Sequence, residues 1–303
     1  MLLKDFIRES VTALQAVYAT KEAEKLVSLL CEEVLGVKSY THIVEPGYEV
    51  EGKHVPRLKE SMARLLDGEP LQYILGYADF GELRFNVNPS VLIPRPETMM
   101  LVNEAVDAAS RLMRMRLPFV KSGSPVRVLD LCTGSGCIAW SMALEAPGVE
   151  VVAVDISGEA LDVARKQPFR DMVRQRKAIA PVFVKADVLD TSADFPYGKF
   201  DIVLSNPPYI LEGQKTSMCR NVLDFEPPLA LFVPDEDPLL FYKAVSVWAD
   251  RFLVDGGLGM VEVNEDLGPQ TSNVFSAAGF HECRIRKDFY DKDRIVSFSK
   301  QSL

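Results

Sequence analysis

The sequence predicts an α/β protein: a mostly parallel sheet that ends in an antiparallel pair of strands and is preceded by a small helical bundle. Three observations predict this fold. From Arg127 onward, short apolar runs alternate with amphipathic stretches, which is typical of a parallel sheet with helices on both faces. The residues before Gly76 show helical periodicity only. A segment rich in aromatic residues, glycine, proline and asparagine separates the two patterns.

Composition bounds the function. The 303 residues are 48% hydrophobic, enough for one large domain or a medium and a small one with a sizeable core. A net charge of −9 argues against a general grip on nucleic-acid phosphates. The sequence begins without a signal-peptide pattern, and no apolar run approaches a membrane span. Five cysteines without C-x-x-C spacing predict reduced thiols and a cytoplasmic protein, and three scattered histidines predict no metal site.

Residues 1–76 are predicted to form the helical bundle. Apolar residues recur at helical spacing in three stretches: Leu3, Phe6, Ile7, Leu14 and Val17; Ala23, Leu26, Leu30 and Val34; Leu58, Met62, Leu65 and Leu66. The bundle carries no chemistry of its own, and it serves either as a structural cap or as a module that docks a protein partner. Residues 77–97 are predicted to be a β-hairpin linker, and residues 98–303 the second domain, which opens with the helix "MMLVNEAVDAASRLMRM".

The second domain is predicted element by element. The expected strands are "VRVLDL", "VEVVAVD", "PVFVKAD", "FDIVLS" and "GLGMVEV", with "HECRIRKDF" and "DRIVSFSK" as the final antiparallel pair. The expected helices are "CIAWSMALEA", "GEALDVARKQ" with Ser157 as its N-cap, "PLLFYKAVSVWADRFL" and "GPQTSNVFSAAG". Ligands of such sheets bind beyond the carboxyl ends of the strands, so motifs at those ends indicate the site.

A glycine turn follows the first of these strands, in "VLDLCTGSGCIA". Gly134 and Gly136 allow a tight bend and a close approach to a ligand, and with Ala139 they match G-x-G-x-x-A. Asp155 ends the next strand, where it could accept hydrogen bonds from both hydroxyls of a ribose. The combination predicts an adenosine-containing ligand. The alternative is a glycine turn used for packing alone.

Three residues, Asp130, Asp187 and Val188, help to identify the adenosine-containing ligand. Asp130 would repel a pyrophosphate, although NAD stays open on this evidence. Asp130 could instead hold the positively charged amino-acid end of S-adenosylmethionine, or it could cap the following turn. Asp187, or the backbone at Val188, could bond an adenine amine, and Asp187 is equally well read as a solvated carboxylate at a strand end.

The stretch "SNPPY" ends the fourth strand, which is expected next to the first. Pro207 and Pro208 have fixed φ angles and no backbone N–H, so the loop is rigid and rich in acceptors. The Asn206 side chain adds an acceptor, and Tyr209 offers a flat face for stacking. Such a frame suits an –NH2 group, whose lone pair it would aim at a sulfonium methyl group. Neither a metal nor a covalent intermediate is required.

These residues resemble the amino-group S-adenosylmethionine methyltransferases, which carry N-P-P-Y after the fourth strand. The stretches "EPLQYILGYADFGELRFNVNPSVLIPRPET", "VLDLCTGSGCIA", "VLSNPPYI", "FEPPLALF" and "DFYDKDRIV" occur in that order. Together they are similar to the release factor glutamine methyltransferase family from about Glu69 to Val296. The resemblance implies a Rossmann-like S-adenosylmethionine-dependent methyltransferase sheet.

The resemblance also implies a substrate, the glutamine of the Gly-Gly-Gln loop of bacterial class 1 peptide chain release factors, methylated at N5 with S-adenosylhomocysteine as the second product. By motif, the cofactor would be bound by Cys132, Thr133, Gly134, Ser135, Gly136, Asp155 and Val188. Asn206 would touch both cofactor and substrate, and Pro207, Pro208 and Tyr209 would hold the glutamine amide. We expect a monomer that binds neither a membrane nor a specific nucleic-acid sequence.

The chain departs from the family pattern at three positions. Cys132 stands where the family usually has glycine, and we expect the fold to adapt so that φ suits a residue with a side chain. Val188 replaces an aromatic residue that could stack on adenine. Met99 replaces an acidic residue after "PRPET". Arg95 and Glu97 either order the loop near the site or form a salt bridge between the domains.

Other functions use some of the same motifs. A glutamine methyltransferase of a ribosomal protein would share them all. An adenine methyltransferase of DNA or RNA would need a basic cleft, and Lys and Arg concentrate only in "RLMRMRLPFVK" and "RKQPFRDMVRQRK", which we interpret as helix surfaces. A non-catalytic cofactor-binding scaffold disagrees with the intact N-P-P-Y sequence.

Overall fold

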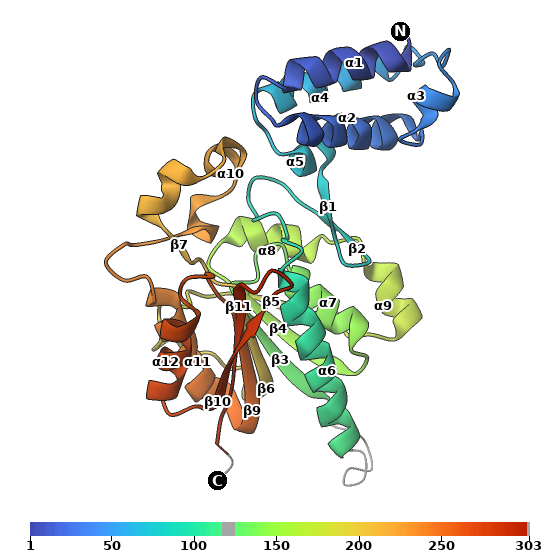
Figure 1. Cartoon of the computed structure of the whole chain (residues 1–303). Coiled ribbons are helices and arrows are strands. Elements are labelled where there is room, and N and C mark those ends of the chain that lie inside the picture. Colours follow the sequence, from blue (N-terminus) through green and yellow to red (C-terminus); the bar gives the residue numbers. More distant parts are fainter. Residues whose placement is uncertain (117–124, 302–303) are drawn as a thin grey trace. The chain divides into compact units, whose positions relative to one another are not determined.

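The computed structural model describes residues 1–116 and 125–301. It divides the chain into two compact units (Figure 1). The smaller unit comprises Met1–Tyr77 together with Met218–Phe225, and the larger unit contains the rest of the described chain. No helix among the described residues is both long enough and apolar enough to cross a membrane.

The smaller unit is helical, as predicted. Its helices are α1 (Leu3–Leu14), α2 (Thr20–Leu35), α3 (Thr41–Val44), α4 (Val55–Leu66), α5 (Leu71–Leu75) and α10 (Arg220–Phe225). The predicted apolar faces of α1, α2 and α4 meet in one core, in which Leu14, Leu30 and Leu58 are fully buried. Val17 and Leu66 were assigned to those faces wrongly: Val17 follows the end of α1, and both side chains are exposed.

A two-stranded sheet follows, formed by β1 (Tyr77–Phe80) and β2 (Leu83–Asn86). Alternate residues of these strands are buried, and the rings of Phe80 and Phe85 lie edge to face with centroids 5.9 Å apart. The chain then enters α6 (Thr98–Arg116). The basic stretch "RLMRMRLPFVK" lies on α6 as far as residue 116, and its remaining residues lie outside the described part of the chain.

The main sheet of the larger unit has seven strands in the order β10-β11-β9-β6-β3-β4-β5. Their bounds are β3 (Val126–Leu131), β4 (Val149–Asp155), β5 (Val182–Lys185), β6 (Phe200–Ser205), β9 (Leu253–Glu262), β10 (His281–Lys287) and β11 (Asp293–Ser299). The pairs from β9 to β5 are parallel, and β11 pairs antiparallel with both β9 and β10. The predicted mixed sheet is confirmed, including the position of β6 beside β3.

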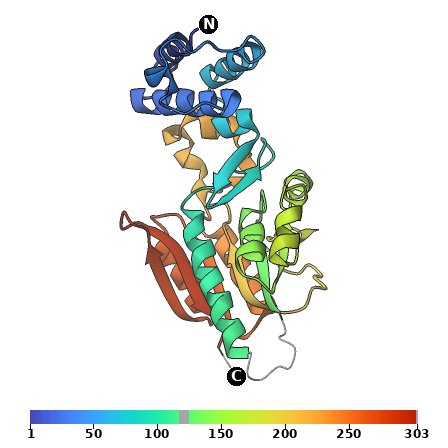
Figure 2. The same cartoon turned by 90° about the vertical axis from the view of Figure 1, so that its right-hand side faces the viewer.

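Helices cover both faces of this sheet (Figures 1 and 2). Beyond α6 they are α7 (Cys137–Glu145), α8 (Gly158–Arg165), α9 (Arg170–Arg176), α11 (Leu240–Phe252) and α12 (Gly268–Ala277). Consecutive strand residues belong to different cores: Val128 packs with α6 and α7, and Leu129 packs with α11 and α12. Burial on both sides explains why the central strands read as unbroken apolar runs.

The remaining elements are short. Two 3-10 helices span Glu212–Ser217 and Pro228–Ala230, and β7 (Ile210–Leu211) pairs in parallel with β8 (Phe232–Val233). The stretch "RKQPFRDMVRQRK" is not a single helix surface, because the chain leaves α8 before Pro168 and re-enters a helix at Arg170. Gln167 and Phe169 between them are buried.

The packing of β9 against β11 generates the first prediction. A Cβ atom at Gly259 would lie 2.1 Å from the ring of Phe298, which is itself stacked on Phe275 at a centroid distance of 3.9 Å. We expect Gly259→Ala to lower the free energy of unfolding by about 1–3 kcal/mol in urea titrations, because neither ring can move freely. Gly158→Ala is the control, since its Cβ would meet only Lys185 Nζ at 3.8 Å. Equal stability of the two variants would contradict this account.

Candidate active site

A cavity of about 160 Å³ opens at the carboxyl ends of the parallel strands, within the larger unit. Each of the loops that follow β3, β4, β5 and β6 contributes to its lining. Of the predicted site residues, those that line it are Cys132, Thr133, Gly134, Ser135, Asp155, Asp187, Val188, Asn206 and Pro208. Asp130, Gly136, Pro207 and Tyr209 lie outside the lining. The structure thus brings most of the predicted residues of two distant motifs to one place.

The two glycines of the turn serve different purposes. Both have positive φ, 54° at Gly134 and 80° at Gly136, as glycine allows. A Cβ atom at Gly136 would lie 3.1 Å from both Trp140 and Ala164, so this glycine lets α7 and α8 pack closely. Nothing lies within 4 Å of a Cβ at Gly134, which borders the cavity. Close packing of the two helices therefore explains why residue 136 is a glycine. Gly134 instead leaves open space beside the cavity.

Cys132 also has a left-handed backbone, with φ of 62°. The sequence led us to expect a backbone adapted to a side chain, but the chain keeps a conformation that favours glycine. The turn between β3 and α7 requires it, because the next backbone N–H, that of Thr133, bonds to the carbonyl of Val154 on β4. Burial, with nearby carboxylates adding to it, raises the pKa of the Cys132 thiol well above its usual range.

Asp155 ties the end of β4 to the glycine turn. Its Oδ2 accepts a hydrogen bond from the Gly134 backbone N–H at 2.8 Å, and its Oδ1 accepts one from the Ser157 N–H at 2.9 Å. Burial raises the pKa of Asp155, whereas these backbone donors lower it. Ser157 caps α8 as predicted, because its Oγ accepts from the Ala160 N–H at 3.1 Å. The carboxylate is therefore held in one orientation at the cavity wall.

Asp130 is fully buried behind the same turn. Its Oδ2 accepts a hydrogen bond from Thr133 Oγ1 at 2.5 Å. Its Oδ1 makes no hydrogen bond of normal geometry in the described chain, although the Ala139 backbone N–H is near enough to lower the pKa of the carboxyl group. Burial raises the pKa of Asp130 to about 7, while the Thr133 hydroxyl lowers it. The bond to Thr133 fits the turn-capping interpretation. The free Oδ1 fits the alternative interpretation, in which Asp130 faces a positively charged group of the ligand. A buried carboxylate oxygen without a donor favours a nearby positive charge.

The third strand end supplies Asp187 and Val188. Asp187 Oδ1 accepts from the Leu189 N–H at 2.8 Å, which makes a local turn. Val188 is buried, and its carbonyl accepts from the indole N–H of Trp248 at 2.9 Å. Both residues line the cavity, and the Asp187 carboxylate has a second oxygen besides the one that accepts from Leu189.

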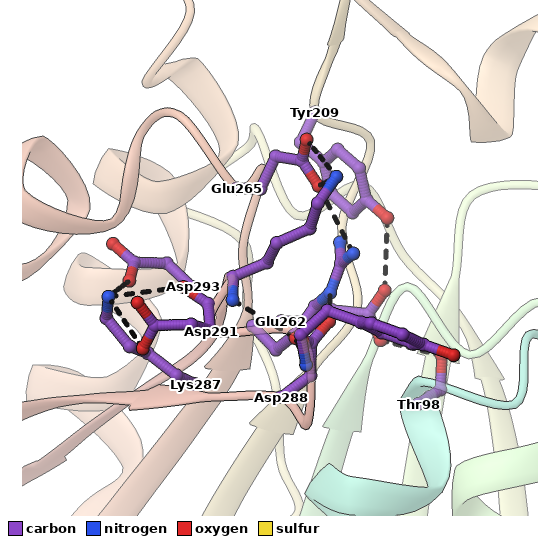
Figure 3. Close-up of polar contacts among 11 residues, drawn as sticks. Thr98, Tyr209, Glu262, Glu265, Lys287, Asp288, Asp291 and Asp293 are labelled. Atoms are coloured by element: carbon purple, nitrogen blue, oxygen red, sulfur yellow. Dashed lines mark hydrogen bonds and ion pairs between the residues drawn. The ribbon is translucent and has the colours of Figure 1, made fainter.

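Two side chains anchor the loop after β6, and Figure 3 shows one of them, Tyr209, beside Glu262. Asn206 Nδ2 donates to Thr98 Oγ1 at 3.2 Å, and Thr98 Oγ1 donates to Glu262 Oε2 at 2.6 Å. The Tyr209 hydroxyl donates to Glu262 Oε1 at 3.0 Å, and the Tyr209 carbonyl accepts from Asn264 Nδ2. One buried carboxylate at the end of β9 therefore connects Asn206, through Thr98, with Tyr209.

Three residues of the site were not predicted from the sequence: Thr98, Glu262 and a second buried carboxylate, Glu226. Glu226 is 2% exposed; its Oε1 accepts from Arg95 Nη2 at 2.5 Å and its Oε2 from the Ile93 N–H at 3.1 Å. Arg95 and Glu226 both belong to the larger unit, so their ion pair orders a loop of the cavity wall within that unit. Glu97 is exposed. The available signal was a glutamate inside each of two otherwise apolar stretches, "GMVEV" and "FEPPLALF".

The hairpin of β10 and β11 carries a second polar network next to Tyr209 (Figure 3). Arg294 donates to Asp288 at 2.7 Å and to Glu265 at 3.2 Å, and Lys292 pairs with Glu265 at 2.7 Å. Burial raises the pKa of the Tyr209 phenol well above its usual range, although the charge of Arg294 lowers it. The Tyr209 hydroxyl therefore keeps its proton and acts as a donor.

No group of three or more potential metal ligands occurs among the described residues.

Comparison with known proteins places the chain in a family. Residues 5–76 match the PrmC N-terminal domain, and residues 97–224 match the Methyltransferase small domain. The "Release factor glutamine methyltransferase" of Bacteroides thetaiotaomicron is 38% identical over 97% of this chain and 98% of its own length. The protein of the same name from Flavobacterium psychrophilum is 33% identical over 98% of each. A solved protein-(glutamine-N5) methyltransferase (release factor-specific) of Alicyclobacillus acidocaldarius aligns with 72% of this chain and 99% of its own, with 27% identity and a TM-score of 0.41.

The left-handed conformation of Cys132 can be tested by comparing two substitutions. Cys132→Gly and Cys132→Ala both remove the thiol, but only glycine removes the steric cost of a Cβ at φ of 62°. We expect the glycine variant to be more stable than the alanine variant by about 1 kcal/mol in chemical denaturation. An alanine variant as stable as the glycine variant would mean that φ at this position imposes no cost.

The raised pKa of Asp130 predicts a pH dependence of stability. Its ionised form is penalised in the folded state, so its contribution is most favourable below pH 3.8 and is lost as pH rises to about 7. Asp130→Asn removes this titration. The free energy of unfolding of the ligand-free protein should therefore fall relative to that of the variant between pH 5 and pH 8, by about 1–3 kcal/mol. Parallel pH profiles of the two proteins would show that the carboxyl group titrates normally.

Proposed function

The chain belongs to the release factor glutamine methyltransferase family, and from this premise we propose that it methylates N5 of the glutamine in the Gly-Gly-Gln loop of bacterial class 1 peptide chain release factors. Relatives with that name match nearly the whole chain, including the helical unit. One structural observation carries the proposal: Asn206 and Pro208 border the same cavity as Gly134 and Asp155. An amide-binding loop and a nucleotide-type turn thus share one space.

S-adenosylmethionine fits the residues of this cavity. Asp155 would accept from the ribose hydroxyls, Asp187 would accept from the adenine amine, and the unpartnered Oδ1 of Asp130 would favour the positively charged end. The turn from Cys132 to Gly136 would lie along the molecule. When bound, S-adenosylmethionine would supply an activated methyl group on a sulfonium and would leave as S-adenosylhomocysteine, while the methylated amide nitrogen gives up one proton to water.

The residues of the chain supply position rather than acid or base. A glutamine amide is a poor nucleophile, so catalysis depends on holding its nitrogen in line with the methyl group. Asn206 Nδ2 is bonded to Thr98, which leaves Oδ1 to accept from the substrate N–H. Pro207 and Pro208 are buried and fix the course of the loop. Tyr209 is held through its hydroxyl, so its ring keeps one orientation for contact with the substrate amide.

We further propose that residues 1–76 recognise the protein partner, that 77–97 is the linker and that 98–303 is the catalytic domain. The match of residues 5–76 to a domain of this family supports a dedicated role for the helical unit. Release factors act on ribosomes, which agrees with a cytoplasmic protein that has reduced cysteines. A net charge of −9 agrees with a substrate that is protein rather than nucleic acid.

The decisive experiment measures transfer of tritiated methyl groups from S-adenosylmethionine to an unmodified class 1 release factor. We expect label on the intact factor and none on a factor whose loop glutamine is changed to alanine. Asn206→Ala should lower the rate by about 100-fold or more, because the amide loses its fixed acceptor. Cofactor binding by this variant should weaken by about tenfold at most.

Two parallel substrates distinguish the other functions. A ribosomal protein fraction tests a different glutamine substrate, and an adenine-containing DNA duplex tests base methylation. Label on the duplex or the ribosomal proteins, with none on the release factor, would refute the proposed substrate. Label on the factor with its loop glutamine replaced would refute the proposed site of methylation.

A further inference from the structure

A line of hydrogen bonds connects a buried carboxylate with the amide of Asn206. Glu262, at the end of β9, is 3% exposed, and both of its oxygens accept from hydroxyl groups, those of Thr98 and Tyr209. Thr98, the first residue of α6, is 1% exposed, and its oxygen lies 3.2 Å from Asn206 Nδ2. Figure 3 shows Glu262 between Thr98 and Tyr209.

The chemistry of these groups fixes the direction of each bond. A carboxylate can only accept, and a threonine hydroxyl has a single proton to give. Since the proton of Thr98 goes to Glu262, the Thr98 oxygen can only accept from Asn206. The Asn206 amide must therefore turn its –NH2 group toward Thr98 and its Oδ1 the other way. The opposite orientation would place two lone-pair-bearing oxygens against each other.

Burial and the charge of Glu97 oppose the charge of Glu262, whereas its hydrogen-bond donors favour it. Burial raises the pKa of this carboxyl group, while the hydroxyls of Thr98 and Tyr209 and the guanidinium of Arg294 lower it. When Glu262 is ionised, the hydroxyl protons of Thr98 and Tyr209 each point to one of its two oxygens. A hydrophobic contact between β9 and α6 would fill the same space without this directionality.

We propose that Thr98 and Glu262 are positioning residues for methyl transfer, because they hold Asn206 in the one orientation that offers Oδ1 to the acceptor amide. This inference rests on the proposed function and extends it to two residues. If Asn206 were reversed, its –NH2 would face the –NH2 of the substrate glutamine, and donor would meet donor. The substrate nitrogen would then lose the bond that orients it.

The first test compares Thr98→Val with Thr98→Ser in the release factor assay. Valine keeps the shape and removes the hydroxyl, whereas serine keeps the hydroxyl. We expect Thr98→Val to lower kcat by about 10–100-fold, with KM for the release factor and the Kd of S-adenosylmethionine changed by about twofold at most. Thr98→Ser should retain kcat within about threefold.

A matched control and a second readout separate this role from packing. Thr271 is fully buried and its hydroxyl has no partner in the described chain, so Thr271→Val should leave kcat unchanged. In the cofactor-free protein, the side-chain amide protons of Asn206, observed by ¹⁵N NMR, should exchange slowly in the wild type and in Thr98→Ser. They should exchange rapidly in Thr98→Val.

Equal loss of kcat in the valine and serine variants would overturn the proposal, because it would indicate a packing role. Wild-type kcat and slow exchange in Thr98→Val would overturn it as well. If Thr98→Val fails to fold, the Glu262→Gln variant is measured instead. Its side chain offers one acceptor oxygen to two hydroxyls, so wild-type kcat in this variant would refute the positioning role of Glu262. Failure of the proposed function gives a different result, since the wild type would then label no release factor while the NMR comparison still reports on Asn206.

Discussion

The register of three neighbouring strands determines where the glycine turn, Asp155 and Asn206 meet at the cavity. Leu131, the last residue of β3, pairs with Val154 on β4 and with Ser205 on β6. The Ser205 hydroxyl donates to the Leu131 carbonyl at 2.9 Å, which secures the two strand ends to each other. Because the three strands stop at one level, the glycine turn, Asp155 and Asn206 emerge side by side. A shift of one residue in β6 would turn its side chains to the opposite face and remove Asn206 from the cavity.

Most of the fold could be predicted from the sequence because its strands are buried on both faces. The runs "VEVVAVD" and "FDIVLS" are β4 and β6 from first to last residue. Spacing also identified Asp155 and Asn206, since a polar residue directly after such a run lies at the strand end. The partners of these residues could not be found in this way. Asn206 bonds to a threonine 108 positions earlier, and Ile93 bonds to a glutamate 133 positions later. Only the fold brings such residues together.

The backbone at Cys132 shows a different limit of sequence reasoning. A residue type restricts φ only on average, and the turn between β3 and α7 overrides the preference of cysteine. Likewise, the sequence cannot show which carboxylates are buried. Asp130, Glu226 and Glu262 are each at most 3% exposed, and each is stabilised differently: by one hydroxyl, by an arginine, or by two hydroxyls. None of the three lines the cavity, so each acts on it through the residues that it holds: Thr133, Arg95, Thr98 and Tyr209.

The protonation of Cys132 has a consequence for the survival of the enzyme. Its side chain borders the cavity in which an alkylating cofactor is proposed to bind. Sulfur attacks such electrophiles as the thiolate, and burial together with Asp155 and Asp130 raises the pKa of this thiol well above its usual range. In the ligand-free protein, the raised pKa favours the thiol over the thiolate. Burial, with the charges of Asp155 and Asp130 adding to it, therefore disfavours the nucleophilic thiolate at this wall of the cavity.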